Sequence, residues 1–96
     1  MVNYIDISID NINLRVYKEY VLYNDKEILI DEIRFDELLR IIRFWKHNYI
    51  SNKIVDGERF VVEVSYNNNY ERYEGVGEYP DNYIYLKEWI GDVCGL

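Results

Sequence analysis

The chain has no alanine, threonine or glutamine, and only one cysteine, one proline and one histidine. A lone cysteine cannot form an internal disulfide, which agrees with a reducing compartment. A single histidine and a single cysteine are too few for a structural metal site built from such ligands. No apolar run approaches the roughly 20 residues that span a bilayer, and the first ten residues lack a signal-peptide pattern. These absences predict a soluble cytoplasmic protein without a metal or a cofactor.

The residues that are abundant predict a folded chain from an AT-rich genome. Hydrophobic residues make up 49% of the 96 residues and aromatic residues 17%, which is too much core-forming material for a disordered chain. The length suits one small domain, residues 1–96. Isoleucine, asparagine and tyrosine, which AT-rich codons supply, are frequent. This bias in amino-acid usage indicates a low-GC bacterium or one of its phages.

The net charge of −7 is concentrated in the C-terminal part of the chain. Residues 1–55 contain nine acids and eight bases, a balance of −1, whereas residues 56–96 contain nine acids and three bases, a balance of −6. Such a charge repels phosphate backbones, so direct binding to nucleic acid or an anionic membrane is disfavoured. A basic protein surface is the expected partner.

The N-terminal third predicts extended segments. Residues 5–9 and 12–16 alternate between apolar and polar side chains, and Asp10-Asn11 between them suits a tight hairpin. The alternation continues through Leu22, so the second strand is expected either to be long or to bend near Lys18-Glu19. A polar turn at residues 24–27 precedes a third predicted strand, residues 28–33.

The stretch FDELLRIIRFWKHNY, residues 35–49, predicts an amphipathic helix. Large apolar side chains recur at helical spacing and form one stripe: Phe35, Leu38, Leu39, Ile42, Trp45 and Tyr49. Charged residues fall on the opposite side. Ile41 and Phe44 lie off the stripe, so the helix is expected either to be embedded between two elements or to meet a partner.

The C-terminal part predicts a second hairpin and a closing helix. Residues 58–66 and 70–78 form the strands, and Gly75 and Gly77 indicate a bulge or a close backbone approach. The helix is expected to begin near Tyr79-Pro80-Asp81 and to end at Gly91 or Gly95. The order β-β-β-α-β-β-α predicts an α+β fold, with an antiparallel sheet of about five strands and both helices on one face.

The sequence does not predict an enzyme. A nucleophile needs an oriented base beside it, and besides a few serines the chain offers only His47 and Cys94, which lie far apart in the sequence. Gly75-Val76-Gly77 lacks the third glycine and the Lys-Ser/Thr pair of phosphate-binding loops, and residues 67–78 do not have EF-hand spacing.

A tyrosine-rich acidic run is the strongest candidate for a functional site. It is the predicted partner-binding set: Glu71, Tyr73, Glu74, Glu78, Tyr79, Asp81, Tyr83 and Tyr85. Carboxylates at alternate strand positions stand roughly 7 Å apart on one face, a spacing of the same order as successive phosphates of a nucleic acid. Tyrosine adds contact area at low entropic cost. The alternative interpretation is a solvated sheet edge whose charges prevent strand addition.

A basic stripe, Arg40, Arg43, Lys46 and His47, is the second candidate. It could bind phosphates or an acidic partner, or it could simply balance nearby carboxylates. A third possibility is a self-complementary dimer in which the acidic run of one copy meets the basic stripe of another.

The leading hypothesis is a non-enzymatic inhibitor that docks on the basic surface of a nucleic-acid-handling protein. In size, charge and alphabet the chain looks like small phage-encoded inhibitors of bacterial defence, such as anti-CRISPR or anti-restriction proteins. The alternative is a structural or assembly module that forms a homodimer through exposed tyrosines and Phe44 or Ile41. A small enzyme or ligand-binding domain would require a concave pocket, which a sequence does not reveal.

Overall fold

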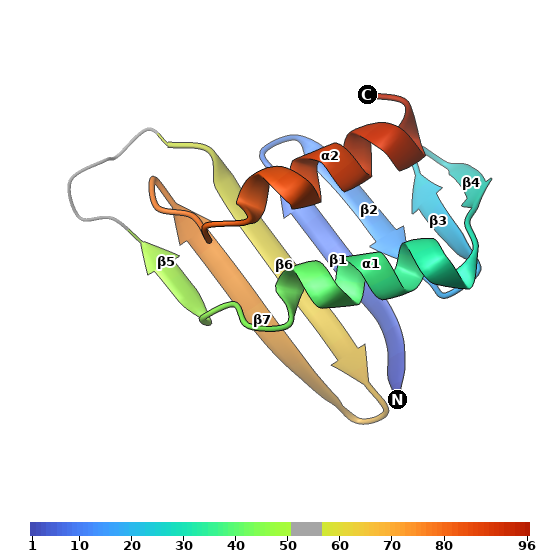
Figure 1. The fold of residues 1–96 in the computed structure, drawn as a ribbon, viewed down its shortest axis with the longest axis horizontal. Coiled ribbons are helices and arrows are strands. Elements are labelled where there is room, and N and C mark those ends of the chain that lie inside the picture. Colours follow the sequence, from blue (N-terminus) through green and yellow to red (C-terminus); the bar gives the residue numbers. More distant parts are fainter. Residues whose placement is uncertain (51–56) are drawn as a thin grey trace.

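The computed structural model describes residues 1–50 and 57–96, which form one sheet covered on one face by two helices (Figure 1). The strands are β1 (Val2–Ile9), β2 (Ile12–Val16), β3 (Tyr20–Tyr23), β4 (Lys26–Leu29), β5 (Asn48–Ile50), β6 (Arg59–Tyr66) and β7 (Asn69–Val76), and the helices are α1 (Glu32–Ile42) and α2 (Tyr83–Cys94). The strand order is β4-β3-β2-β1-β6-β7-β5. The predicted α+β class is confirmed.

The predicted number and direction of the strands are wrong. The described residues form seven strands rather than about five, and the sheet is mixed because β5 runs parallel to β7. All other neighbours are antiparallel. In Figure 1 both helices cross the same face of the sheet, and the other face, the open face, carries no helix of the described residues.

The hairpin of β1 and β2 is confirmed. Ile5 pairs with Val16 and Ile9 with Ile12, so the alternating apolar side chains of both strands lie under the helices. Asp10 in the turn has a φ of 48°, the left-handed backbone that aspartate tolerates. β1 also pairs with β6, which makes it a central strand of the sheet.

The chain reverses between β2 and β3 instead of continuing as one strand. The amide of Tyr17 donates to the carbonyl of Tyr20 at 2.8 Å, and this closes a turn at the bend that the sequence left open. The predicted strand at residues 28–33 is wrong beyond Leu29. There Asp31 accepts a hydrogen bond from the amide of Arg34 at 2.9 Å and caps α1, which begins at Glu32.

Helix α1 ends at Ile42, seven residues before the predicted end of the helix at Tyr49. Its buried face consists of Phe35, Leu38 and Ile42, as the apolar stripe predicted. Residues 48–50 form β5 instead, because β7 supplies backbone partners that an extra turn of helix would lose. The amide of Glu74 donates to the carbonyl of His47 at 3.1 Å, next to the parallel pairs of β5 and β7.

Helix α2 begins at Tyr83, three residues after Pro80, which is buried in the preceding loop. Leu86, Trp89 and Ile90 face the core. Of the two predicted terminators, Gly95 ends the helix: its φ is 73°, and its amide donates to the carbonyl of Gly91 at 2.9 Å.

Gly75 marks the close approach that the sequence indicated. A Cβ there would lie 2.6 Å from Cε1 of Phe60 and 2.8 Å from Cβ of Tyr49, so only glycine fits between β6 and β5. Neither helix of the described residues combines the length and the apolar composition that crossing a membrane requires.

Candidate functional site

Two members of the predicted partner-binding set belong to the core. Tyr73 and Tyr83 are each only 7% exposed. The Tyr73 hydroxyl donates to Oε2 of Glu71 at 2.6 Å, and the Tyr83 hydroxyl donates to Oε2 of Glu58 at 2.8 Å. Burial, and then the neighbouring carboxylate, raises the pKa of both phenols above the usual range. These rings therefore fix the fold and are not a contact surface.

The acids of β7 do not form a single row. Glu71 lies opposite buried Val64 on the helix-covered side, whereas Glu74 lies opposite Val61 on the open face, because successive strand residues point to opposite faces. On the open face Glu74 accepts from Arg72 at 2.7 Å and lies 3.9 Å from Arg59. Glu74 is thus neutralised within its own chain.

The remaining members of the set lie in the segment that joins β7 to α2. Glu78 and Asp81 are exposed there, and Tyr85 in the first turn of α2 is 57% exposed. Tyr79 is half-buried and its ring stacks on Tyr83 at 4.8 Å between centroids. In this part of the chain Glu78, Asp81 and Tyr85 are therefore the exposed members of the set.

Every base in residues 57–96 is already paired with a carboxylate. Arg59 pairs with Glu74, Arg72 with Glu63 and Glu74, and Lys87 with Glu58. Within the described residues, four carboxylates of this part have no ion-pair partner: Glu71, Glu78, Asp81 and Glu88. The excess negative charge is therefore present as separate, solvent-facing carboxylates.

The basic stripe is broken by the end of α1. Arg40, Arg43 and Lys46 remain exposed and make no ion pair within the described part of the chain. His47 instead stacks on the ring of Tyr73 at 5.0 Å, with its Nδ1 2.9 Å from the carbonyl oxygen of Arg72. Phe44 stands between the bases with 84% of its surface exposed.

Shallow grooves place acids beside the stripe. One of about 290 Å³ is bordered by Arg40, Arg43 and Glu71, and a second of about 300 Å³ by Arg40 and Glu88. A third of about 360 Å³ is bordered by Phe44, Lys46 and Asp81. Opposite charges thus border each of the three grooves, and exposed Phe44 lines the third one.

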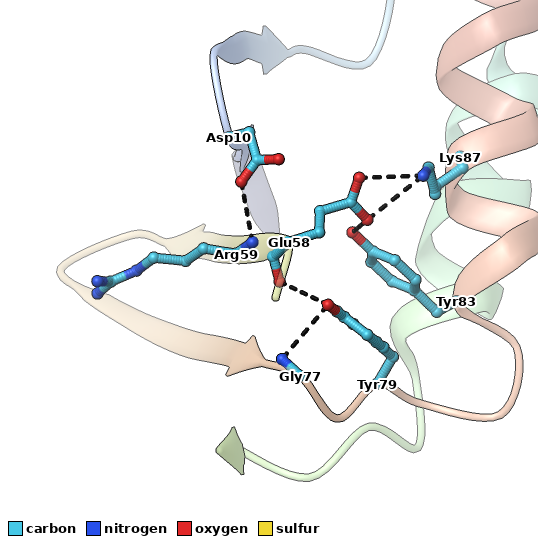
Figure 2. Close-up of polar contacts among 7 residues, drawn as sticks. All are labelled: Asp10, Glu58, Arg59, Gly77, Tyr79, Tyr83 and Lys87. Carbon is cyan, nitrogen blue, oxygen red and sulfur yellow. Dashed lines mark hydrogen bonds and ion pairs between the residues drawn. The ribbon is translucent and has the colours of Figure 1, made fainter. Parts of the chain in front are cut away.

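A polar cluster that the sequence did not indicate is centred on Glu58 (Figure 2). Its carboxylate accepts from the Tyr83 hydroxyl and lies 3.0 and 3.3 Å from Nζ of Lys87. Its carbonyl accepts from the hydroxyl of Tyr79 at 2.7 Å. Glu58 therefore ties the start of β6 to both ends of the turn into α2.

Asp10 extends this cluster to the β1–β2 turn. Its Oδ1 accepts from the amide of Arg59 at 3.0 Å, and its own amide donates to the carbonyl of Arg59 at 2.9 Å. Beside the cluster lies a groove of about 390 Å³. The only sequence signal for this site was the four-residue spacing of Tyr83 and Lys87 on one helix face, because Glu58 and Asp10 arrive there through tertiary structure.

The described residues contain no group of three His, Cys, Asp or Glu side chains that could hold a metal ion. Burial raises the pKa of the Cys94 thiol, which lowers its thiolate fraction and hence its nucleophilicity. Exposed carboxylates, by contrast, can accept charge-assisted hydrogen bonds from a basic partner.

No protein-family model, curated protein or solved structure matches this chain.

Proposed function

We propose that this chain is a non-enzymatic binding protein that docks on the basic, nucleic-acid-binding surface of another protein and blocks it. The mechanism is competition with DNA or RNA, in the manner of phage-encoded inhibitors of bacterial defence such as anti-CRISPR and anti-restriction proteins. The cytoplasm of a low-GC bacterial host is the compartment we propose. One observation carries this proposal: the bases of residues 57–96 are all paired internally, while four carboxylates of the same range have no ion-pair partner among the described residues.

Unpaired carboxylates support docking on a basic surface for two physical reasons. They can each accept short, charge-assisted hydrogen bonds from lysine or arginine without first breaking an internal ion pair. Their summed field also attracts a basic surface before contact and speeds association. Both effects weaken as salt rises, because exposed charges are screened.

The segment between β7 and α2 is the part of the acidic run that best suits contact. Glu78 and Asp81 are exposed and have no ion pair among the described residues, and exposed Tyr85 supplies aromatic area beside them. Glu74 is a weaker candidate because Arg72 and Arg59 already hold it.

The first experiment is affinity capture from the lysate of a low-GC bacterium at low and high salt. The bait is the unaltered chain, the double variant Glu78→Lys/Asp81→Lys, or the control Glu19→Lys/Glu27→Lys. The control makes the same change in net charge at exposed acids of the β3–β4 region. Retained proteins are identified by mass spectrometry.

We expect the unaltered chain and the control to retain a nucleic-acid-handling protein at low salt only. The Glu78→Lys/Asp81→Lys variant should lose it while remaining folded. Retention of the same protein by both double variants would refute docking through this segment, and retention of no nucleic-acid-binding protein would refute the proposed function.

A homodimer is the second candidate, and exposed Phe44 in a groove that Lys46 and Asp81 also line favours that arrangement. A two-fold interface uses the same patch on both copies, so the patch has to be self-complementary. Arg40 and Arg43 of one copy could then face Asp81 and Glu88 of the other, with the two Phe44 side chains near the axis.

Charge exchange tests the dimer directly. The variant Arg40→Glu/Arg43→Glu reverses the charge of two bases in this patch, and Asp81→Lys/Glu88→Lys reverses the charge of two acids. For a two-fold dimer each variant alone should be monomeric in sedimentation, whereas an equal mixture should form a heterodimer with both contacts restored. A mixture that remains monomeric, or an unaltered chain that is monomeric at high concentration, would rule this candidate out.

A further inference from the structure

The groove of about 390 Å³ between the β1–β2 turn and α2 has an apolar floor and a negative rim. Its volume is at the small end of the range for ligand pockets, and its surface is mostly apolar. The floor consists of Ile9, Ile12, Ile90 and Leu96. Asp10, Glu58 and Lys87 stand at the rim, so the two carboxylates exceed the single ammonium.

The contacts of Lys87 show what the rim recognises. Its Nζ lies 3.0 and 3.3 Å from the two carboxylate oxygens of Glu58, and Lys87 is one of the residues that line the groove. Long basic side chains bury their methylene stem against apolar surface and keep the charged head in a polar environment. The groove thus already accommodates a basic side chain of the chain itself, at one end.

Asp10 provides a second carboxylate that is not neutralised. Oδ1 accepts from the amide of Arg59, and in Figure 2 the other oxygen of Asp10 points away from that contact. No ion pair to Asp10 exists among the residues that the structure describes. A cation placed over the groove would therefore find an acceptor at Asp10 and could share the acceptor at Glu58.

We propose that this groove receives one arginine side chain of the partner, with its methylene stem on the isoleucine floor and its guanidinium at Asp10 and Glu58. This inference rests on the proposed function, because it names an anchor for a basic partner. Arginine fits better than lysine because its planar guanidinium presents five donors and can serve two carboxylates at once. It fits better than an apolar side chain because the rim carries excess negative charge.

The test uses a free peptide, so it does not depend on identifying the partner. The isotope-labelled chain is titrated with acetyl-Gly-Arg-Gly-amide, and with acetyl-Gly-norleucine-Gly-amide as the apolar control, while amide shifts are followed by NMR. Asp10→Asn retains an acceptor for the Arg59 amide, and Glu58→Gln retains one for Tyr83. Lys87→Met retains the stem and removes the competing ammonium. Glu88→Gln is the matched control on α2, outside the groove.

We expect the arginine peptide to shift amides of residues 9–12 and 90–91, with a dissociation constant about two- to five-fold higher in Asp10→Asn and Glu58→Gln. Lys87→Met should bind the same peptide more tightly, and Glu88→Gln should be unchanged. Shifts elsewhere, equal binding of the norleucine peptide, or weaker binding by Lys87→Met would overturn the assignment. Such a failure alongside positive affinity capture would remove the groove and leave docking through Glu78 and Asp81 intact.

Discussion

The indole Nε1 of Trp45 lies 2.6 Å from Oδ1 of Asn82, and this hydrogen bond joins the end of α1 to the start of α2. Nδ2 of Asn82 donates in turn to the carbonyl of Ile41 at 2.8 Å. At the other end of the helical layer, Nε1 of Trp89 donates to the carbonyl of Arg34 at 2.8 Å. Hydrogen bonds therefore connect the two helical regions at two places. The bonds of Asn82 also hold the segment that precedes α2 in position.

Asn82→Ala should destabilise the fold measurably. It removes both hydrogen bonds and leaves the indole of Trp45, a residue that is 8% exposed, without its acceptor. An unsatisfied buried donor costs about 1 to 3 kcal/mol, so urea unfolding should show a loss in that range. The control Asn68→Ala, in the exposed β6–β7 turn, should have little effect. Equal stability of both variants would contradict this role for Asn82.

Leu38 and Phe44 should differ sharply although both are large apolar residues of the α1 region. Leu38 is 0% exposed and Phe44 is 84% exposed. Leu38→Ala should cost about 2 to 5 kcal/mol through lost burial and a cavity, whereas Phe44→Ala should stay within about 0.5 kcal/mol. Both are measured by thermal unfolding at low protein concentration. A large loss for Phe44→Ala would show that Phe44 is covered in solution.

Two glycine substitutions should differ in their effect on the free energy of unfolding. Gly75→Ala forces a Cβ to within 2.8 Å of Phe60 and the Glu78 carbonyl, and such overpacking costs about 1 to 3 kcal/mol. Gly91→Ala meets only the carbonyl oxygen of exposed Leu96, at 3.3 Å, inside a helix where alanine is preferred by about 0.5 to 1 kcal/mol. Chemical denaturation should therefore rank Gly91→Ala at or above the unaltered chain, and Gly75→Ala below it.

Stability should fall at alkaline pH because of Tyr73 and Tyr83. Burial and the Glu71 or Glu58 carboxylate raise the pKa of each phenol in the folded chain. In the unfolded chain these phenols lose their protons near pH 10, so the folded state binds more protons above that pH. Their contribution is thus complete below about pH 10 and is lost as pH rises towards the folded pKa values.

Tyr83→Phe checks this assignment. It removes one of the two titrating groups. The unfolding free energy should therefore fall less steeply with pH, because one group instead of two contributes to the slope. Tyrosinate absorbance should also show that Tyr73 and Tyr83 ionise only as the chain unfolds. An unchanged slope in Tyr83→Phe would contradict the raised pKa of Tyr83.

Much of the fold could be predicted because local patterns decide it. The period-two segments 5–9, 12–16 and 58–66 correspond to β1, β2 and β6, and the apolar stripe from Phe35 to Ile42 became the buried face of α1. One long strand or a bend near Lys18-Glu19 both remained possible from the sequence, since Tyr17-Lys18-Glu19 has no glycine, proline or asparagine to interrupt the alternation. β5 could not be predicted because Trp45 and Tyr49 have helical spacing. Only pairing with β7, far along the chain, makes the extended conformation preferable.

The candidate site was less accessible to prediction because tyrosine is amphipathic. Tyr73 and Tyr83 have the composition of an interface, yet each buries its ring and places its hydroxyl on a carboxylate. The exposure of Glu78 and Asp81 could be predicted because charged side chains favour water. Asp10 and Glu58 were missed, since 48 residues of sequence separate two groups that the sheet brings together.

Competition for the captured partner tests the central proposal most directly. A fluorescent DNA or RNA oligonucleotide is bound to that partner, and its anisotropy is followed as the chain is added at several salt concentrations. If the chain docks on the nucleic-acid-binding surface, it should displace the oligonucleotide completely, and displacement should weaken as salt rises. The concentration of Glu78→Lys/Asp81→Lys that is needed for displacement should be much higher than that of Glu19→Lys/Glu27→Lys. A ternary complex of partner, oligonucleotide and chain, or equal displacement by both double variants, would contradict it.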